Sequence, residues 1–103
     1  SGAELEAAVS NHRIWVDPKA PGAIRSSPAI RYYYANGRYE FSGENRARSP
    51  GTYSVIGDRL CTRLDAAPQG WCIQLFYDEA KKQYFQRLDG AERLDPLIVT
   101  SIP

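Results

Sequence analysis

Hydrophobic and polar residues alternate with a period of two along most of the chain, after an opening segment whose period is close to that of a helix. In this segment, "AELEAAVSN", Leu5, Ala8 and Val9 fall on one helix face. Acidic residues occupy its first turn, where the helix dipole favours them. We expect a helix over about residues 3–10, with Asn11 as its C-terminal stop.

The strongest local signal is the segment "AIRYYYANGRYEF", in which Asn36-Gly37 is the preferred two-residue turn of type I′ between alternating strands. This turn would place Tyr34 opposite Tyr39. One face of the hairpin would then point to the core and the other to solvent. The expected core face carries Ile30, Tyr32, Tyr34, Tyr39 and Phe41, and the expected outer face carries Arg31, Tyr33, Arg38 and Glu40.

A second hairpin is predicted in "TYSVIGDRLCTRL", where Gly57-Asp58 has glycine at the first central position of a type II′ turn. This turn would place Val55 opposite Leu60, so that apolar side chains face each other. The segments "WCIQLFY", "QYFQRL" and "LIVTSI" continue the strand pattern, and each follows a polar or glycine-containing turn.

The pattern therefore predicts about eight short strands with turn signals about every 8–12 residues, which is typical of an antiparallel barrel or sandwich. Because consecutive strands usually pair with each other, we expect an up-and-down meander over about residues 12–102. The N-terminal helix would cover one end or an open face of the sheet. We expect a single, mainly β domain that spans residues 1–103.

The two cysteines of the chain, Cys61 and Cys72, lie on the predicted strands before and after one chain reversal. A symmetric reversal makes them direct cross-strand partners with Cβ atoms about 4.5–5.5 Å apart, close to the disulfide span of about 3.5–4.5 Å. A metal site would need further ligands, and His12 is the only histidine. We favour a disulfide; two buried free thiols in a cytosolic protein are the remaining alternative.

The charge of the chain is nearly balanced, with 13 basic and 12 acidic residues and a net charge of +1. Bulk charge therefore does not steer the chain to nucleic acid or to an anionic membrane. No apolar run reaches the roughly 18 residues of a spanning helix, and no signal peptide stands at the start of the sequence. We interpret the chain as cytosolic or as the mature part of an exported protein.

Candidate chemistry is sparse. No motif places a nucleophile beside His12, and most carboxylates lie in segments where turn formation explains them. No phosphate loop, GxSxG, HExxH or EF-hand spacing is present. We therefore predict no enzymatic activity, no catalytic residues, no metal and no cofactor.

Five segments in order, "LEAAVSN", "RYYYANGRYEF", "GTYSVIGDRLC", "WCIQLFYD" and "QYF", resemble a large group of small exported, periplasmic β-rich proteins of bacteria, whose function is uncharacterised. The most specific part is "GTYSVIGDRLC" followed by Cys72. The chain departs from the pattern at Asn11, where glycine is usual, and in the Pro/Ser-rich residues 18–28. The resemblance implies a periplasmic or secreted protein with a disulfide, and it implies no activity.

Two sets of residues are candidates for binding. Tyrosines flanked by arginines could stack on single-stranded nucleic acid, but binding platforms of that class are usually basic and this chain is not, so we expect no nucleic-acid partner. The candidate contact patch consists of Arg31, Tyr33, Arg38, Arg46 and Arg48. The candidate cavity lining consists of Tyr32, Tyr34, Tyr39 and Phe41.

We expect a non-enzymatic binding module of the bacterial envelope, in which loops 17–28 and 42–51 dock a protein or glycan. One alternative is a lipocalin-like barrel that carries a small apolar ligand. Another is an inhibitor that blocks an envelope hydrolase with one loop. The chain is expected to be a monomer or a weak dimer.

Overall fold

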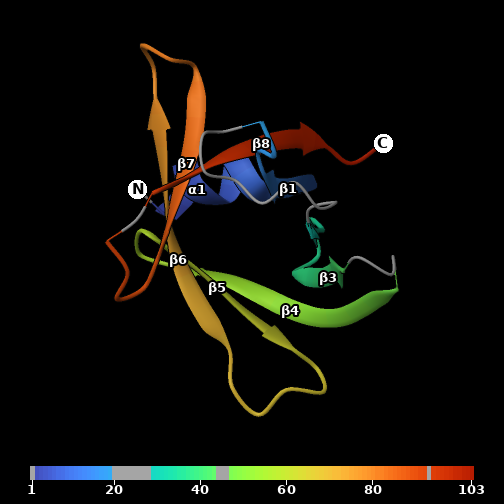
Figure 1. Cartoon of the computed structure of the whole chain (residues 1–103). Coiled ribbons are helices and arrows are strands. Elements are labelled where there is room, and N and C mark those ends of the chain that lie inside the picture. The colour runs from blue at the N-terminus through green and yellow to red at the C-terminus, as the bar shows by residue number, and fades with distance from the viewer. Residues whose placement is uncertain (1, 20–28, 44–46, 93) are drawn as a thin grey trace.

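A computed structural model describes residues 2–19, 29–43, 47–92 and 94–103. It contains one short helix and eight strands (Figure 1). The expected fold class, mainly β with one N-terminal helix, is confirmed. The elements are α1 (Gly2–Val9), β1 (His12–Val16), β2 (Ile30–Tyr33), β3 (Arg38–Ser42), β4 (Arg48–Ile56), β5 (Arg59–Leu64), β6 (Trp71–Asp78), β7 (Gln83–Leu88) and β8 (Asp95–Ser101).

The strands form a closed barrel in chain order. Each strand pairs antiparallel with the next, and β8 returns to pair with β1, where Ile14 lies opposite Val99. Closure pairs the first and last strands and so leaves no open sheet edge between them. The sequence predicted the up-and-down order but left open whether the sheet forms a barrel or a sandwich. The structure shows a closed barrel.

Inward-facing apolar side chains fill the barrel. Burial of each large side chain of this kind contributes about 1.5–3 kcal/mol to the free energy of unfolding. The buried cluster consists of Val9, Ile14, Tyr33, Tyr39, Leu60, Ile73 and Leu97. Val9 belongs to α1, so the helix supplies part of this core and covers one end of the barrel.

The helix ends where the sequence predicts. Asn11 has a φ of 61°, a left-handed conformation that asparagine tolerates better than most residues. The Ser10 amide donates to the Glu6 carbonyl oxygen at 2.8 Å and closes the last turn. The start of α1 lies against the β4–β5 turn, since a Cβ added at Gly2 would be 3.2 Å from the Gly57 carbonyl oxygen.

The β4–β5 hairpin has the predicted register. Val55 lies opposite Leu60, and the two-residue connection is Gly57-Asp58. Gly57 has a φ of 63°, as the first central position of a type II′ turn requires.

The predicted register of the β2–β3 hairpin is wrong by one residue. Tyr33, not Tyr34, lies opposite Tyr39. The loop has three residues: the Tyr34 amide donates to the Arg38 carbonyl oxygen at 2.9 Å, and the Gly37 amide donates to the Tyr34 carbonyl oxygen at 3.0 Å. Gly37 has a φ of 86°, so the connection is a turn followed by a glycine bulge, the usual three-residue hairpin loop.

This one-residue difference reverses the two faces of β2. Arg31 and Tyr33 point into the barrel and are 8% and 0% exposed, whereas they were expected on the outside. Tyr32 and Tyr34, expected in the core, lie on the outer face, although Tyr32 is only 9% exposed there, with Tyr34 and Arg48 against its ring. On β3, Tyr39 is buried as expected.

The β6–β7 hairpin projects beyond the body of the barrel (Figure 1). β5 pairs with β6 only as far as Gln74, while β6 and β7 continue to pair with each other as far as Asp78 and Gln83. The core-facing side chains near the tip of this hairpin therefore have no strand on the β5 side to cover them. Tyr77 is consequently 49% exposed, although it follows the alternation of the buried Ile73.

Candidate functional site

A groove lies between α1 and the projecting hairpin, and we call it the helix-side groove. Its volume is about 280 Å³. α1 packs mainly against β1 and β4, and this placement leaves a space on the side of β6 and β7. The groove is lined by Glu4, Leu5, Ala8, Asp58, Leu75, Phe76, Tyr77 and Tyr84.

Three separate elements position the walls of the helix-side groove. Leu5 and Ala8 lie one turn apart on the same face of α1. Leu75 and Tyr77 lie two residues apart on β6 and share the inner face of the hairpin. Tyr84 of β7 lies opposite Tyr77, and their ring centroids are 4.7 Å apart.

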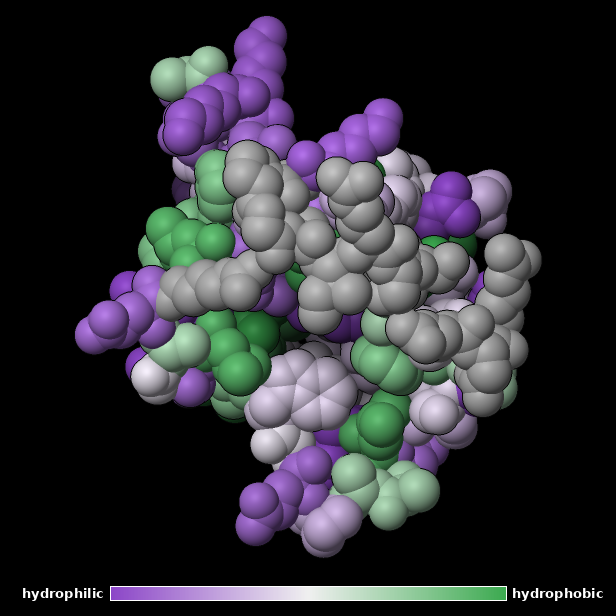
Figure 2. Space-filling model, viewed as in Figure 1, coloured by the Kyte–Doolittle hydropathy of each residue, from purple (hydrophilic) through white to green (hydrophobic). Residues whose placement is uncertain are grey.

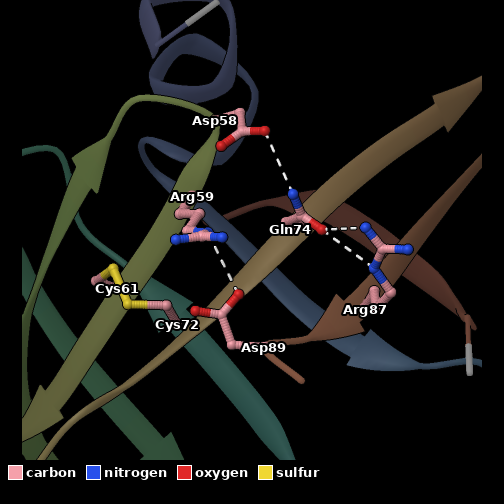
Figure 3. A network of polar contacts seen from close by, with 7 residues as sticks. All are labelled: Asp58, Arg59, Cys61, Cys72, Gln74, Arg87 and Asp89. Carbon is pink, nitrogen blue, oxygen red and sulfur yellow. Dashed lines mark hydrogen bonds and ion pairs between the residues drawn. A yellow bond between two sulfur atoms is a disulfide. The ribbon is translucent and has the colours of Figure 1, made fainter. Parts of the chain in front are cut away.

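Asp58 stands at the rim of the helix-side groove, on the two-residue turn between β4 and β5. Figure 3 shows its carboxylate close to the helix, with Gln74 below it. The Gln74 Nε2 donates to Asp58 at 3.3 Å, and Arg87 donates to the Gln74 Oε1 through Nε at 3.1 Å and Nη2 at 2.5 Å. This chain of contacts holds the Asp58 carboxylate in place from the outer face of β6.

The charged side chains among the described residues that line the helix-side groove are both acidic. They are Glu4 and Asp58, and no lysine or arginine is among the described residues that line it. Two arginines lie nearby on the outer face of the sheet. Arg59 is paired with Asp89 at 3.3 Å, and Arg87 contacts Gln74 and the ring of Phe76, whose centroid is 5.5 Å from the guanidinium carbon.

Exposed apolar side chains surround the helix-side groove. Tyr77 is 49% exposed, Phe76 is 40% exposed, and Ile56, two residues before Asp58, is 63% exposed. In Figure 2, hydrophobic residues gather on the side of the molecule where Figure 1 places β6 and β7. Clustered exposed apolar surface of this kind marks interaction sites more often than single exposed residues do.

The disulfide between Cys61 and Cys72 is formed (Figure 3). The two residues are direct cross-strand partners on β5 and β6, and their Cα atoms are 4.0 Å apart. The expected pairing and register are therefore confirmed. A second hollow, of about 250 Å³, borders the disulfide and is lined by Thr52, Tyr53, Ser54, Cys61, Thr62, Arg63, Gly70, Trp71 and Cys72.

Four side chains on the outer face of β2, β3 and β4 form what we call the outer tyrosine cluster: Tyr32, Tyr34, Glu40 and Arg48. The rings of Tyr32 and Tyr34 are stacked with centroids 6.4 Å apart, and the Arg48 guanidinium carbon lies 4.3 Å from the centroid of Tyr32. The Tyr34 hydroxyl donates to Glu40, and Arg48 pairs with Glu40 at 3.2 Å. Glu40, Arg48 and the Tyr34 hydroxyl therefore each have a partner inside the cluster.

These contacts shift the pKa values of Tyr34, Glu40 and Arg48 in the outer tyrosine cluster. The hydrogen bond from Tyr34 lowers the pKa of the Glu40 carboxyl, and Arg48 lowers it further. Burial raises the pKa of Tyr34, and its hydrogen bond to the carboxylate raises it further. Glu40 and Tyr34 both keep their usual charge state at neutral pH.

The predicted contact patch is not one surface. Arg31 and Tyr33 are buried, so their expected exposure is wrong. Arg38 is exposed and pairs with Asp65 at 2.9 Å, while Arg48 belongs to the outer tyrosine cluster. Arg46 lies outside the described residues, as do residues 20–28 and 44–46 of the two candidate loops.

Because of the same register difference, the residues predicted to line a cavity lie on two different faces of the sheet. Tyr32 and Tyr34 lie outside the barrel, where they cannot line its interior. Tyr39 is buried, and Phe41 packs against the core.

Polar groups are also present inside the barrel. Among the described residues, the hydroxyls of Tyr33 and Tyr39 have no hydrogen-bond partner. Burial raises the pKa of both phenols; Arg31 lowers both pKa values to a smaller extent. Arg31 itself donates to the Gln86 Oε1 at 2.6 Å.

The single histidine has ordinary local contacts. The His12 Nδ1 donates to the Ser10 carbonyl oxygen at 2.8 Å, and its Nε2 lies 3.5 Å from the Ser101 hydroxyl oxygen. Neither His12 nor Ser101 is among the residues that line the helix-side groove or the hollow beside the disulfide. Within residues 2–19, 29–43, 47–92 and 94–103, no group of three or more His, Cys, Asp or Glu side chains could hold a metal ion.

Sequence reasoning missed the helix-side groove. Glu4 was explained by the helix dipole and Asp58 by turn formation, and both explanations are locally correct. The one available signal was the alternation in β6, which continues to Tyr77 and makes this strand longer than its predicted neighbours.

Comparisons of the chain with protein-family models, curated proteins and solved structures gave no match. The resemblance to exported bacterial proteins therefore stays a prediction. In the described part of the chain, no helix is long and apolar enough to cross a membrane.

Proposed function

We propose that this protein is a non-enzymatic binding module whose recognition site is the helix-side groove. The observation that carries the proposal is the composition of this groove: apolar and aromatic side chains from α1, β6 and β7 line it together with the carboxylates of Glu4 and Asp58. Concave apolar sites with a few placed polar groups are typical binding sites. The walls belong to a helix, a strand pair and a short turn, so the site is largely preformed.

We also propose that the protein is exported to the bacterial periplasm or secreted. The disulfide supports this proposal, since such bonds form and persist mainly in oxidising compartments. Intact-mass measurement of the protein isolated from its host tests it. An oxidised chain is expected, and a reduced chain would argue for the cytosol.

The carrier and inhibitor alternatives have less support. Tyr32 and Tyr34 supplied half of the residues assigned to the carrier's cavity, and they lie on the outer face. Most of one candidate docking loop, residues 20–28, lies outside the described residues, so the structure adds nothing for an inhibitory loop.

The proposed site is tested by two-dimensional amide NMR during titration with 2-phenylethanol, a neutral aromatic probe. We expect shifts in the amides of α1, the β4–β5 turn and the tip of the β6–β7 hairpin. The variant Ala8→Trp should abolish these shifts, because the indole would fill the groove. The matched control Ala7→Trp should retain them, since Ala7 is exposed and does not line the groove.

Thermal unfolding of both variants checks that each retains the fold. Probe-induced shifts that persist in a folded Ala8→Trp protein, or that fall elsewhere on the barrel, would contradict the proposed site.

A further inference from the structure

Resting on this proposed function, we infer that the helix-side groove receives an extended segment of a partner protein, which adds to the edge of β6 as an antiparallel strand. In strand addition of this kind, backbone hydrogen bonds supply affinity and alternate side chains supply specificity. Three features lead to this occupant: the point where the β5–β6 pairing ends, the course of the groove along β6, and the direction of the backbone groups of Tyr77.

The edge of β6 on the β5 side is unpaired over residues 75–78. β5 pairs with β6 only as far as Gln74, whereas β7 pairs with the other side of β6 as far as Asp78. In the described part of the chain, no third strand pairs with β6. At about 3.3 Å per residue, this edge is about 13 Å long. An antiparallel strand added here would continue the ladder that β5 forms with β6.

The helix-side groove runs along this edge of β6 and not over one face of the sheet. Consecutive residues of a strand point to opposite faces. Leu75 and Tyr77 therefore share one face and Phe76 points to the other, yet all three line the groove. A hollow that borders all three lies against the strand backbone between them. Leu5 and Ala8 of α1 line the same hollow from the helix.

The backbone groups of Tyr77 point toward the helix-side groove. The Cys72 carbonyl oxygen accepts from the Asp89 amide at 3.1 Å, which places this carbonyl on the β7 side of β6. In an antiparallel ladder, the backbone groups of successive residues point alternately to the two neighbouring strands. Even-numbered residues of β6 therefore direct their amide and carbonyl groups to β7, and odd-numbered residues direct them to the opposite side. At Tyr77, beyond the end of the β5–β6 pairing, that side is the groove.

The side chains beside this edge suit an extended segment that carries apolar residues. Cross-strand neighbours on one face contact each other. The inner-facing side chains of an added strand would contact Leu75 and Tyr77, and its outer-facing side chains would contact Phe76, which is 40% exposed. β-branched residues pack well at such positions.

A separate extended segment fits this site better than a second copy of the chain. The edge of β6 and the helix α1 line the same groove, so an added strand has to enter between them. In a symmetric dimer the two β6 edges would pair with each other, and each copy would bring its own α1 into this space. An extended peptide brings no such helix.

The experiment compares the peptide acetyl-Val-Thr-Val-Thr-amide with two isomers of equal mass, one N-methylated at both valines and one at both threonines. Each is titrated into the oxidised full chain and followed by amide NMR. In the antiparallel arrangement, the peptide residues on the same face as Tyr77 direct their amides to β6. The valines suit this apolar inner face, so methylation of their amides should weaken binding about ten-fold. Methylation of the threonine amides should leave the affinity nearly unchanged.

The Tyr77 amide gives a direct readout on the protein. Its hydrogen exchange should slow when the unmethylated peptide binds. Tyr77→Pro removes this amide, whereas the matched control Tyr77→Ala removes the ring and keeps the amide. Proline is tolerated in an edge strand where the amide faces away from the paired neighbour, so β6 should stay paired with β7. Tyr77→Ala should bind the peptide about five-fold more tightly than Tyr77→Pro, and thermal unfolding checks that both variants are folded.

The outcomes separate this inference from the proposed function. Equal affinity of the two N-methylated isomers at the groove would overturn strand addition, and the reverse order of affinity would overturn the antiparallel arrangement. A dimer of the peptide-free protein that Tyr77→Pro dissociates and Tyr77→Ala does not would overturn the separate partner in favour of a second copy. If the unmethylated peptide shifts no groove amide while 2-phenylethanol does, only the inference fails; if neither probe does, the proposed function fails as well.

Discussion

The outer tyrosine cluster and the helix-side groove contain similar chemistry in two different settings. Both combine tyrosine rings with carboxylates. In the outer tyrosine cluster, Arg48 covers Tyr32 and pairs with Glu40, which accepts from Tyr34. In the helix-side groove, the corresponding rings and carboxylates line an open space. We infer that the first arrangement stabilises the barrel, whereas the second is available for binding.

The cause of this difference is the geometry of the two hairpins. The outer tyrosine cluster lies on β2, β3 and β4, which pair side by side, so neighbouring strands supply partners across the sheet. The helix-side groove lies where β6 and β7 extend past β5. Beyond Gln74, no strand pairs with β6 on the β5 side, so no neighbouring strand there supplies partners for the side chains of the projecting tip.

Loss of the disulfide is the largest expected effect. Cys61→Ala with Cys72→Ala should lower the free energy of unfolding by about 2–3 kcal/mol, since the bond closes a short loop. The bond joins β5 to β6, which lines the groove, and neither strand belongs to the cluster, so hydrogen exchange should rise more in β5 and β6 than in β2 and β3. Denaturant unfolding and hydrogen exchange measure both effects. Unchanged stability would show that strand pairing alone holds this hairpin.

Removal of one hydroxyl beside the outer tyrosine cluster is expected to have the next largest effect. The Tyr53 hydroxyl donates to the Tyr34 carbonyl oxygen at 2.6 Å and ties β4 to the β2–β3 loop. Tyr53→Phe should lower the free energy of unfolding by about 1 kcal/mol, measured by denaturant unfolding. Tyr77→Phe in the groove is the matched control and should change it by only a few tenths. An equal loss in the free energy of unfolding for both variants would mean that the Tyr77 hydroxyl also stabilises the fold.

Arg48→Ala tests whether the outer tyrosine cluster is a stabilising unit. It removes the cation–ring contact and the ion pair, and should lower the free energy of unfolding by about 0.5–1 kcal/mol. Groove binding of 2-phenylethanol should not change. Arg63→Ala, at another exposed arginine of the barrel, is the control and should have a smaller effect. A loss of probe binding in Arg48→Ala would show that the two regions are coupled.

The pH dependence of the outer tyrosine cluster is the smallest expected effect. Because the folded-state pKa of Glu40 is below its unfolded value of 4.5, its contribution is present above that pH and is lost as the pH falls through the folded pKa. Glu40→Gln should therefore lower the melting temperature slightly at neutral pH and match the unchanged protein in strong acid. If the melting temperatures still differ in strong acid, the effect of Glu40→Gln comes from packing and not from the charge of Glu40.

The two tight hairpins show how far local sequence could predict the fold. At β4–β5, Gly57-Asp58 defines both the turn and the register, and the prediction is confirmed. At β2–β3, Asn36-Gly37 correctly marks a turn, but the glycine forms a bulge in a three-residue loop. Two-residue and three-residue loops share this dipeptide, and they differ by one residue in register.

The register of β2–β3 is decided by packing across the barrel. All three residues of the "YYY" run are tyrosines, so local apolar alternation does not distinguish its two faces. In the folded barrel, the Tyr33 ring meets Tyr39 and Tyr53, with centroids 5.1 Å away in both contacts. Tyr53 belongs to β4, and its position relative to Tyr33 exists only after the strands assemble.

The sequence by itself determined the elements whose causes are local: the helix and its stop at Asn11, the strand alternation, the glycine turns and the pairing of Cys61 with Cys72. Only the tertiary structure decided that β8 closes on β1, which face of β2 is buried, and that Glu4, Asp58 and Tyr84 line one groove. These outcomes depend on contacts between residues far apart in the chain. Local patterns are short-ranged and do not specify how such residues meet.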